Sequence, residues 1–189
     1  MLMLSGTACS HGSSSSAQLT PDQVNRYVQV KGATASLTRL AYLISAADST
    51  VQELSHQSPH SRTFRQLVYG ARLGWNNVVV QLNDFTQAQA VVVPELTTTV
   101  GLHKTLATTW LNELDALRMH PPKSRQALLR SLSGPQKQEL KNRYLLSDTA
   151  AALAKVTCAL QLKYPVLATP ADAATSCGTA KQLAANPAT

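Results

Sequence analysis

The chain has 189 residues, which is long enough for one domain with a substantial core and short for two. Hydrophobic residues make up 44% of it and charged residues 14%, a balance that excludes an intrinsically disordered chain. No uninterrupted apolar run approaches the roughly 18 residues that a membrane-spanning helix needs. The net charge of +7 predicts attraction to anionic partners, and most of the excess lies between residues 118 and 143.

The N-terminus combines a cysteine with small residues and a polar linker. Gly6, Thr7 and Ala8 directly precede Cys9, and residues 10–19 are rich in serine. This arrangement resembles the lipobox of bacterial lipoproteins. In that family the cysteine is diacylated and becomes the new N-terminus, and the polar linker tethers the folded domain to the membrane.

The resemblance implies a use for each part of the N-terminal segment. Residues 1–8 would be the remnant of a signal peptide whose apolar core we expect to begin upstream of Met1, and residues 9–19 would be a flexible tether. Cys9 would then anchor the chain in the bacterial envelope, facing the periplasm from the outer membrane in a diderm cell. Two alternatives stay open: plain secretory cleavage after Ala8, and a cytosolic N-terminus with an unmodified cysteine.

Two further cysteines, Cys158 and Cys177, remain once Cys9 is assigned to a lipid. One even pair in an oxidising compartment predicts a disulfide bond. Closing a loop of this length stabilises a protein by roughly 3 kcal/mol. The alternative is two free thiols. No Cys-x-x-Cys and no His/Cys cluster occurs in the sequence, so neither redox catalysis nor zinc binding is predicted.

Apolar periodicity predicts two long helices in the first half of the chain. Thr20 and Pro21 are typical of the cap and the first position of a helix. From there, apolar residues recur at alternating spacings of three and four to about Gln57. Ser58-Pro59 breaks this pattern and predicts a reversal. The second helix is expected over residues 62–93.

The second half predicts three more helical segments. Pro94 opens a helix that we expect to end near His120. A short helix is predicted over residues 124–132. Ser133-Gly134-Pro135 is then expected to break the chain before a last long helix that ends ahead of Pro165.

The predicted fold is therefore all-α. Residues 20–164 are expected to form an elongated up-and-down bundle of four long helices plus a short helix. Residues 165–189 are expected to be a mostly irregular tail, with at most a turn of helix after Pro170, which the disulfide pins to the bundle.

The helix predicted after Pro94 carries the most regular stripe, with a 3.5-residue period from Leu96 to Leu117 that predicts packing against neighbouring helices. His103 is the one ionisable residue on this stripe, and we interpret it as a neutral core histidine whose N–H bonds a neighbouring helix. Trp75, His103 and Trp110 could instead line a gap in the core that carries a small ligand. The alternative is a closed core filled by the two tryptophans.

No motif in the sequence specifies a reaction. Gly-x-Ser-x-Gly, His-Glu-x-x-His and phosphate-loop patterns do not occur, and Glu113 and Asp115 point to different sides of a helix. His56 and His60 have the spacing of a helical metal pair, but Pro59 between them disfavours a common face. We therefore predict no catalytic residues, no metal site and no cofactor, with an enzyme assembled from scattered residues as an open alternative.

The sharpest surface feature is a basic segment that contains a single acidic residue, Glu139. It suits anionic lipid head groups, a cell-wall polymer or an acidic protein. The alternative reading is a solvated connector. Nucleic acid is disfavoured because no aromatic residue lies among these charges before Tyr144, and export removes that partner. The basic segment consists of Arg118, Lys123, Arg125, Arg130, Lys137, Lys141 and Arg143.

Together these features predict a membrane-tethered lipoprotein of the cell envelope that acts as a non-enzymatic binding module for an envelope protein or an anionic polymer. Two roles fit such a module: an accessory of an envelope machine, and an inhibitor of the immunity-protein type. A small-ligand carrier that uses the bundle core is the second hypothesis.

Overall fold

The computed structural model describes residues 19–185, and no strand occurs within this range. The all-α fold expected from the sequence is confirmed. The elements in chain order are α1 (Pro21–Ser55), α2 (Arg62–Asn83), α3 (Gln87–Val92), α4 (Glu95–Met119), α5 (Arg125–Lys163), the 3₁₀ turn η1 (Pro165–Leu167) and α6 (Pro170–Ala185).

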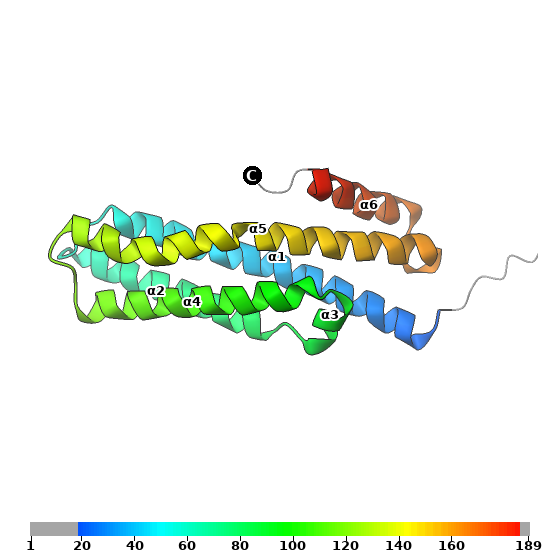
Figure 1. The fold of residues 1–189 in the computed structure, drawn as a ribbon, viewed down its shortest axis with the longest axis horizontal. Coiled ribbons are helices and arrows are strands. Elements are labelled where there is room, and N and C mark those ends of the chain that lie inside the picture. Colours follow the sequence, from blue (N-terminus) through cyan, green and yellow to red (C-terminus); the bar gives the residue numbers. More distant parts are fainter. Residues whose placement is uncertain (1–18, 186–189) are drawn as a thin grey trace, which may run out of the picture.

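The four long helices form an elongated up-and-down bundle (Figure 1). Helix α1 packs against α2, α2 against α4, α4 against α5, and α5 closes the ring against α1. Helix α6 lies along the outer side of the C-terminal half of α5 (Figure 1). The predicted bundle of four long helices is therefore confirmed, although two of its connections differ from the expectation.

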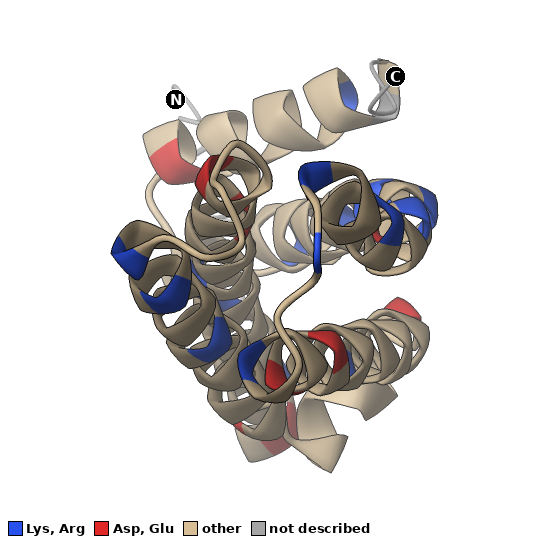
Figure 2. Ribbon diagram, turned by 90° about the vertical axis from the view of Figure 1, so that its left-hand side faces the viewer, with Lys and Arg blue, Asp and Glu red and all other residues tan. Residues whose placement is uncertain are grey.

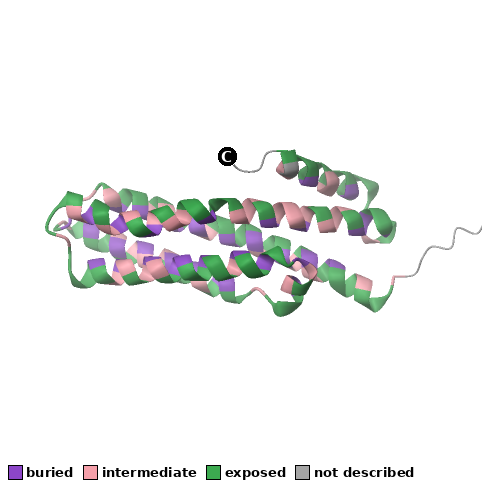
Figure 3. Ribbon diagram, in the orientation of Figure 1, coloured by how far each residue is buried: buried purple, intermediate pink, exposed green. Residues whose placement is uncertain are grey.

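One face of each long helix supplies the core (Figure 3). The alternating spacing of three and four along α1 keeps one apolar stripe turned inward, and burial of each such side chain contributes roughly 1.5–3 kcal/mol for the larger aliphatic residues. The buried apolar residues of α1 are Tyr27, Val30, Ala33, Leu37, Leu40, Ile44, Ala47, Val51 and Leu54.

The start of α1 agrees with its sequence signal. The Thr20 hydroxyl accepts a hydrogen bond from the backbone N–H of Gln23 at 3.4 Å, and the Gln23 side-chain carbonyl accepts one from the backbone N–H of Thr20 at 2.9 Å. This reciprocal pair satisfies two donors that a helix start leaves free. Pro21 occupies a first-turn position, where its missing N–H costs nothing.

The single helix expected over residues 62–93 is wrong, because the chain leaves helical geometry between Asn83 and Gln87. Thr86 caps the new helix α3: its hydroxyl accepts from the backbone N–H of Gln89, and the Gln89 side chain accepts from the backbone N–H of Thr86. This capping box replaces the hydrogen bonds that a continuous helix would have made. The break also brings buried Gln89 against α1, where its Nε2 lies 3.1 Å from the position that a Cβ on Gly32 would occupy.

The break expected at Ser133-Gly134-Pro135 is also wrong, because α5 runs through it without interruption. A proline disfavours helical geometry at the preceding residue partly by clashing with that residue's Cβ, and Gly134 has none. The Pro135 ring is buried, so its packing offsets the lost hydrogen bond. Residues 124–132 are therefore the first turns of α5 and not a separate short helix.

The mostly irregular tail expected after residue 165 is wrong as well, because residues 170–185 form α6. Thr169 caps this helix: its hydroxyl accepts from the backbone N–H of Asp172 at 3.2 Å, and the Asp172 carboxylate accepts from the backbone N–H of Thr169 at 3.2 Å. Thr169-Pro170 thus repeats the start signal seen at Thr20-Pro21.

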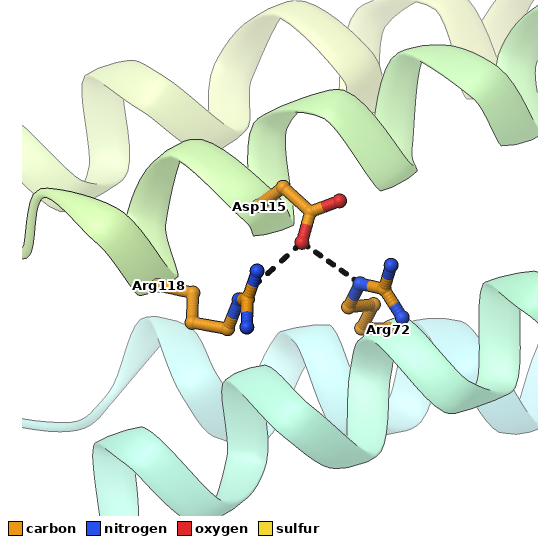
Figure 4. A network of polar contacts seen from close by, with 3 residues as sticks. All are labelled: Arg72, Asp115 and Arg118. Carbon is orange, nitrogen blue, oxygen red and sulfur yellow. Dashed lines mark hydrogen bonds and ion pairs between the residues drawn. The ribbon is translucent and has the colours of Figure 1, made fainter.

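An ion-pair cluster joins α2 to α4 on the outside of the bundle (Figure 4). One Asp115 oxygen lies 2.8 Å from Nε of Arg72 and 3.4 Å from Nε of Arg118. The hydrogen bond from Arg72 is the main reason that the pKa of Asp115 lies below its usual value, and the charges of both arginines add to it. All three side chains are open to solvent, so this cluster connects α2 and α4 but contributes little to the free energy of unfolding.

Helix α5 contains the one stretch among the described helices that is long and apolar enough to be a candidate membrane span. One 18-residue window in it has a mean hydropathy of 1.2, enough to cross a membrane by length and composition alone, and 22% of that window is buried. The core helix of a bundle meets the same criterion. Several apolar residues of α5, including Leu146, Ala150 and Val156, are half-buried against the core.

Candidate functional site

Cys158 of α5 and Cys177 of α6 form a disulfide bond, with their Cα atoms 5.0 Å apart. The predicted pairing is confirmed, and the alternative of two free thiols is wrong. The bond holds α6 alongside α5. Cys9, with the lipobox-like Gly6-Thr7-Ala8, lies outside the described residues.

The seven residues of the basic segment are all exposed, but they do not form one continuous surface. Arg118 is occupied by its ion pair with Asp115. Arg125 reaches the end of α1, where its Nε donates to the Ser55 carbonyl oxygen at 3.4 Å and its guanidinium lies 3.3 Å from Nδ1 of His56. These two arginines are therefore engaged in contacts within the bundle, Arg118 on its own helix α4 and Arg125 at the end of α1.

Three residues of the basic segment share one face of α5. Arg130, Lys137 and Lys141 are spaced by seven and four residues, so they lie on the same side of the helix, opposite its core face. Figure 2, which looks along the bundle from the end at which α5 begins, shows Lys and Arg gathered on α5 and the loop before it.

Exposed apolar side chains flank these three charges. Leu140 is 54% exposed and Tyr144 is 46% exposed, although both are large enough to favour burial. We refer to this mixed basic and apolar face as the outer stripe of α5. It consists of Leu129, Arg130, Lys137, Leu140, Lys141 and Tyr144.

The residues proposed for a core pocket do not line one common cavity, although Trp110 borders a cavity of about 220 Å³ next to the one that His103 lines. Trp75 and Trp110 are fully buried and stack on each other, with ring centroids 5.6 Å apart and planes inclined by 20°. His103 is also buried, but it lines a separate cavity of about 380 Å³ between α1, α4 and α5. The stacked tryptophans fill the space between α2 and α4 at this level of the bundle.

His103 bonds to its own helix, and not to a neighbouring helix as expected. Its Nδ1 lies 2.8 Å from the carbonyl oxygen of Thr99, and because a carbonyl only accepts, Nδ1 carries the proton. Burial lowers the pKa of His103 below its usual value, although the Thr99 bond and the charge of Glu139 oppose this. The neutral ring therefore leaves the lone pair of Nε2 available as a hydrogen-bond acceptor.

An acidic pair that no sequence motif predicted lies on the same cavity. Asp48 of α1 and Glu139 of α5 both line the 380 Å³ space with His103, and both also line an adjoining cavity of about 220 Å³. Arg143 lies at the edge of both cavities and supplies the nearby positive charge. The site therefore joins three helices that the linear sequence keeps far apart.

Asp48 is held in its protonated form by this environment. Burial raises its pKa to about 9, and the hydrogen bond with Glu139 and the negative charge of that residue act in the same direction. The charge of Arg143 opposes the shift. Two carboxyl groups that share one proton avoid placing two negative charges side by side. Oδ1 of Asp48 is buried and has no hydrogen-bond partner among the described residues.

This cavity can bind a polar group and exchange a proton with it, since a protonated carboxyl, a carboxylate and a neutral imidazole all reach it. No family model, no curated protein and no solved structure matches the chain. Within residues 19–185 no group of three or more His, Cys, Asp or Glu side chains is arranged to hold a metal ion.

The sequence contained only a weak signal for the acidic pair. Asp48 directly follows Ala47 of the buried stripe, although other carboxyl groups of this chain, such as Glu53, also lie beside core positions. Glu139 is the single acid of the basic segment. The pairing of Asp48 with Glu139 depends on how α1 and α5 are rotated about their axes, which the sequence does not specify.

Proposed function

We propose that this chain is an exported, membrane-tethered binding domain that captures an acidic protein of the bacterial envelope through the outer stripe of α5. The observation that carries the proposal is the interleaving of three exposed cations with three exposed large apolar side chains on one helix face. Charges of one sign speed the encounter with an oppositely charged partner. Apolar and aromatic residues at the centre of an interface supply most of its affinity.

The mixed character of the stripe favours a protein over an anionic polymer. A polymer such as a phosphate-rich cell-wall chain needs positive charge alone, so Leu140 and Tyr144 would remain in water when it binds. A protein that presents carboxylates around an apolar centre covers both kinds of side chain. The stripe also lacks an internal counter-ion, because Glu139 faces the cavity with Asp48.

Two observations support the proposed export and membrane anchoring. The disulfide between Cys158 and Cys177 is typical of proteins that fold in an oxidising compartment. The residues before Cys9 resemble the lipobox of lipoproteins, and the serine-rich stretch after it suits a tether.

The intact mass of the protein purified from its native membranes tests whether it is exported and lipid-anchored. We expect a chain that begins at Cys9, carries two or three acyl groups, and gains two mass units on reduction. A chain that begins at Met1, with an unmodified Cys9, would overturn the lipoprotein proposal.

Cross-linking in native cells tests the capture. A photo-reactive residue at position 140 of the full chain should yield an adduct with an acidic protein. The triple variant Arg130→Glu, Lys137→Glu, Lys141→Glu should reduce this adduct at least tenfold. A matched triple with the same change in net charge on α1 and α2, namely Arg39→Glu, Arg62→Glu and Arg65→Glu, should leave it unchanged.

Two results would contradict the capture proposal. Equal loss in both triple variants would mean that net charge, and not the outer stripe, attracts the partner. Retention of the wild-type protein on an anionic wall polymer, without any protein adduct, would assign the stripe to a polymer instead. Helical circular dichroism must be the same in all variants, since every substituted residue is exposed.

A further inference from the structure

Helix α6 does not lie flush on the bundle. It leaves a cavity of about 650 Å³ between itself, α1 and α5, a volume within the range of small-molecule sites. Its floor is formed by small and aliphatic side chains, among them Ala35 and Leu37 of α1 and Ala154 and Leu153 of α5. The cavity is separate from the outer stripe and from the acidic pair, whose residues do not line it.

A buried amide with an unused acceptor lies in the wall of this cavity. Gln161 is 4% exposed, and its Nε2 donates a hydrogen bond to the Tyr27 hydroxyl at 3.1 Å. Its Oε1 is buried and has no hydrogen-bond partner among the described residues. A buried polar atom without a partner is costly. The terminal torsion of a glutamine is soft, so this oxygen can turn toward an occupant without movement of the helix.

The charges at the cavity balance each other. Lys31 of α1 and Asp172 of α6 both line it, and the charge of Lys31 is one of the causes that hold the pKa of Asp172 below its usual value, after the hydrogen bonds from Thr169. The Lys31 ammonium also lies 5.5 Å from the centre of the Tyr27 ring. The other polar residues of the lining are one serine and five threonines, and each threonine hydroxyl donates to a carbonyl oxygen of its own helix. An occupant therefore meets an apolar floor, hydroxyl-bearing side walls, a neutral amide and a rim with no net charge.

We propose that this cavity binds a single-chain amphiphile, with its aliphatic chain along the α1 and α5 floor and an uncharged hydroxyl-bearing head at Gln161. A hydroxyl group both donates and accepts, so it satisfies the glutamine amide in either orientation. The disulfide between Cys158 and Cys177 then fixes α6 as the outer wall of the site. This activity is independent of the proposed protein capture.

Calorimetric titration of the oxidised full chain with 1-monolauroylglycerol tests the proposal. Ala154→Trp, which fills the cavity, should weaken binding at least tenfold. Ala159→Trp should bind as the wild type does, because position 159 is exposed on the same helix and does not line this cavity. Gln161→Leu should weaken binding about tenfold, as expected for one lost hydrogen bond.

Each opposite outcome overturns a stated part of the proposal. Absence of binding to the wild type, or equal binding to Ala154→Trp, would exclude the cavity as the site. Tighter binding of laurate than of 1-monolauroylglycerol would show that the head group is an anion and not an uncharged alcohol. The outer-stripe triple variant should bind the amphiphile normally, so failure of this proposal is distinguishable from failure of protein capture.

Discussion

Trp75 of α2 and Trp110 of α4 stack at the centre of the bundle, yet the indole N–H of each is buried without an acceptor among the described residues. The stacked rings bring a large apolar area into the core and contribute beyond that area through their mutual geometry. Each unpaired N–H costs part of this gain. The pair therefore combines a strong stabilising contact with a local defect.

This combination predicts losses of very different size for two substitutions at one position. Trp110→Ala should lower the free energy of unfolding by roughly 3–5 kcal/mol, because it leaves a cavity. Trp110→Phe should cost much less, because it keeps an aromatic ring and removes the unpaired N–H. Urea unfolding measures both values, and a similar large loss in both variants would contradict the proposed defect.

Two glycines of α2 predict a second pair of outcomes. A Cβ on Gly74 would lie 3.3 Å from the backbone Cα of Ala47, whereas a Cβ on Gly70 would lie 3.6 Å from a methyl group of Thr50. Gly70→Ala should therefore stabilise the protein by up to about 1 kcal/mol through helix propensity. Gly74→Ala should lose that gain, because α1 and α2 would have to separate. Thermal unfolding compares the two, and equal stabilisation by both would show that the helices adjust freely.

The acidic pair predicts a stability that falls as pH rises. Asp48 has an ordinary pKa of 3.8, as in an unfolded chain, and a pKa of about 9 in the fold. The folded state therefore holds a proton that the unfolded state has lost, and its stabilising contribution is complete below about pH 4 and disappears as the pH rises toward 9. The slope is at most about 1.4 kcal/mol per pH unit for one proton.

Asp48→Asn should flatten this dependence, because asparagine keeps the shape of the side chain, has an N–H that can donate to Glu139, and cannot ionise. Its advantage over the wild type should grow between pH 5 and pH 8, as measured by urea unfolding at each pH. A wild-type slope that survives in Asp48→Asn would place the titrating group elsewhere.

The attachment of α6 predicts a local response to reduction. Ala173 and Ala180 are the buried apolar residues among those of this helix whose burial is described, and alanine side chains contribute little when they are buried. Cleavage of the disulfide should therefore release α6 without unfolding the four long helices. Hydrogen exchange with and without reductant should show fast exchange in residues 170–185 and unchanged protection around Trp110. Loss of protection throughout the bundle would contradict this separation.

The sequence predicted the bundle because each long helix carries its own complete signal. Thr20 caps the first helix, and the apolar stripes along α1 and α4 need no knowledge of their partners. The disulfide followed from the number of cysteines and the expected compartment. Helix caps, apolar stripes and the number of cysteines can all be recognised in the sequence without knowing which helices pack together.

The errors came from local signals that compete. Gly134 removes the clash that makes a proline end a helix, so Pro135 did not act as a break. Thr86 caps α3 within a stretch whose neighbours predicted one continuous helix. Thr169 caps α6 within a stretch whose neighbours predicted an irregular tail. The acidic pair and the cavity under α6 depend on the rotation and spacing of packed helices, which side-chain packing decides over long distances in sequence.

Because α1 and α5 are antiparallel, the start of α1, which follows the tether, lies at the same end of the bundle as the end of α5. Nε2 of Gln23, at the start of α1, donates a hydrogen bond to the Tyr164 hydroxyl at the end of α5. At 1.5 Å per helical residue, the outer stripe then stands about 30 to 50 Å along α5 from that end. A lipid on Cys9 would hold this end toward the bilayer, so the domain would act as a rigid spacer that presents its cations well beyond the layer of head groups. A partner anchored in the same membrane would need a comparable height to reach them.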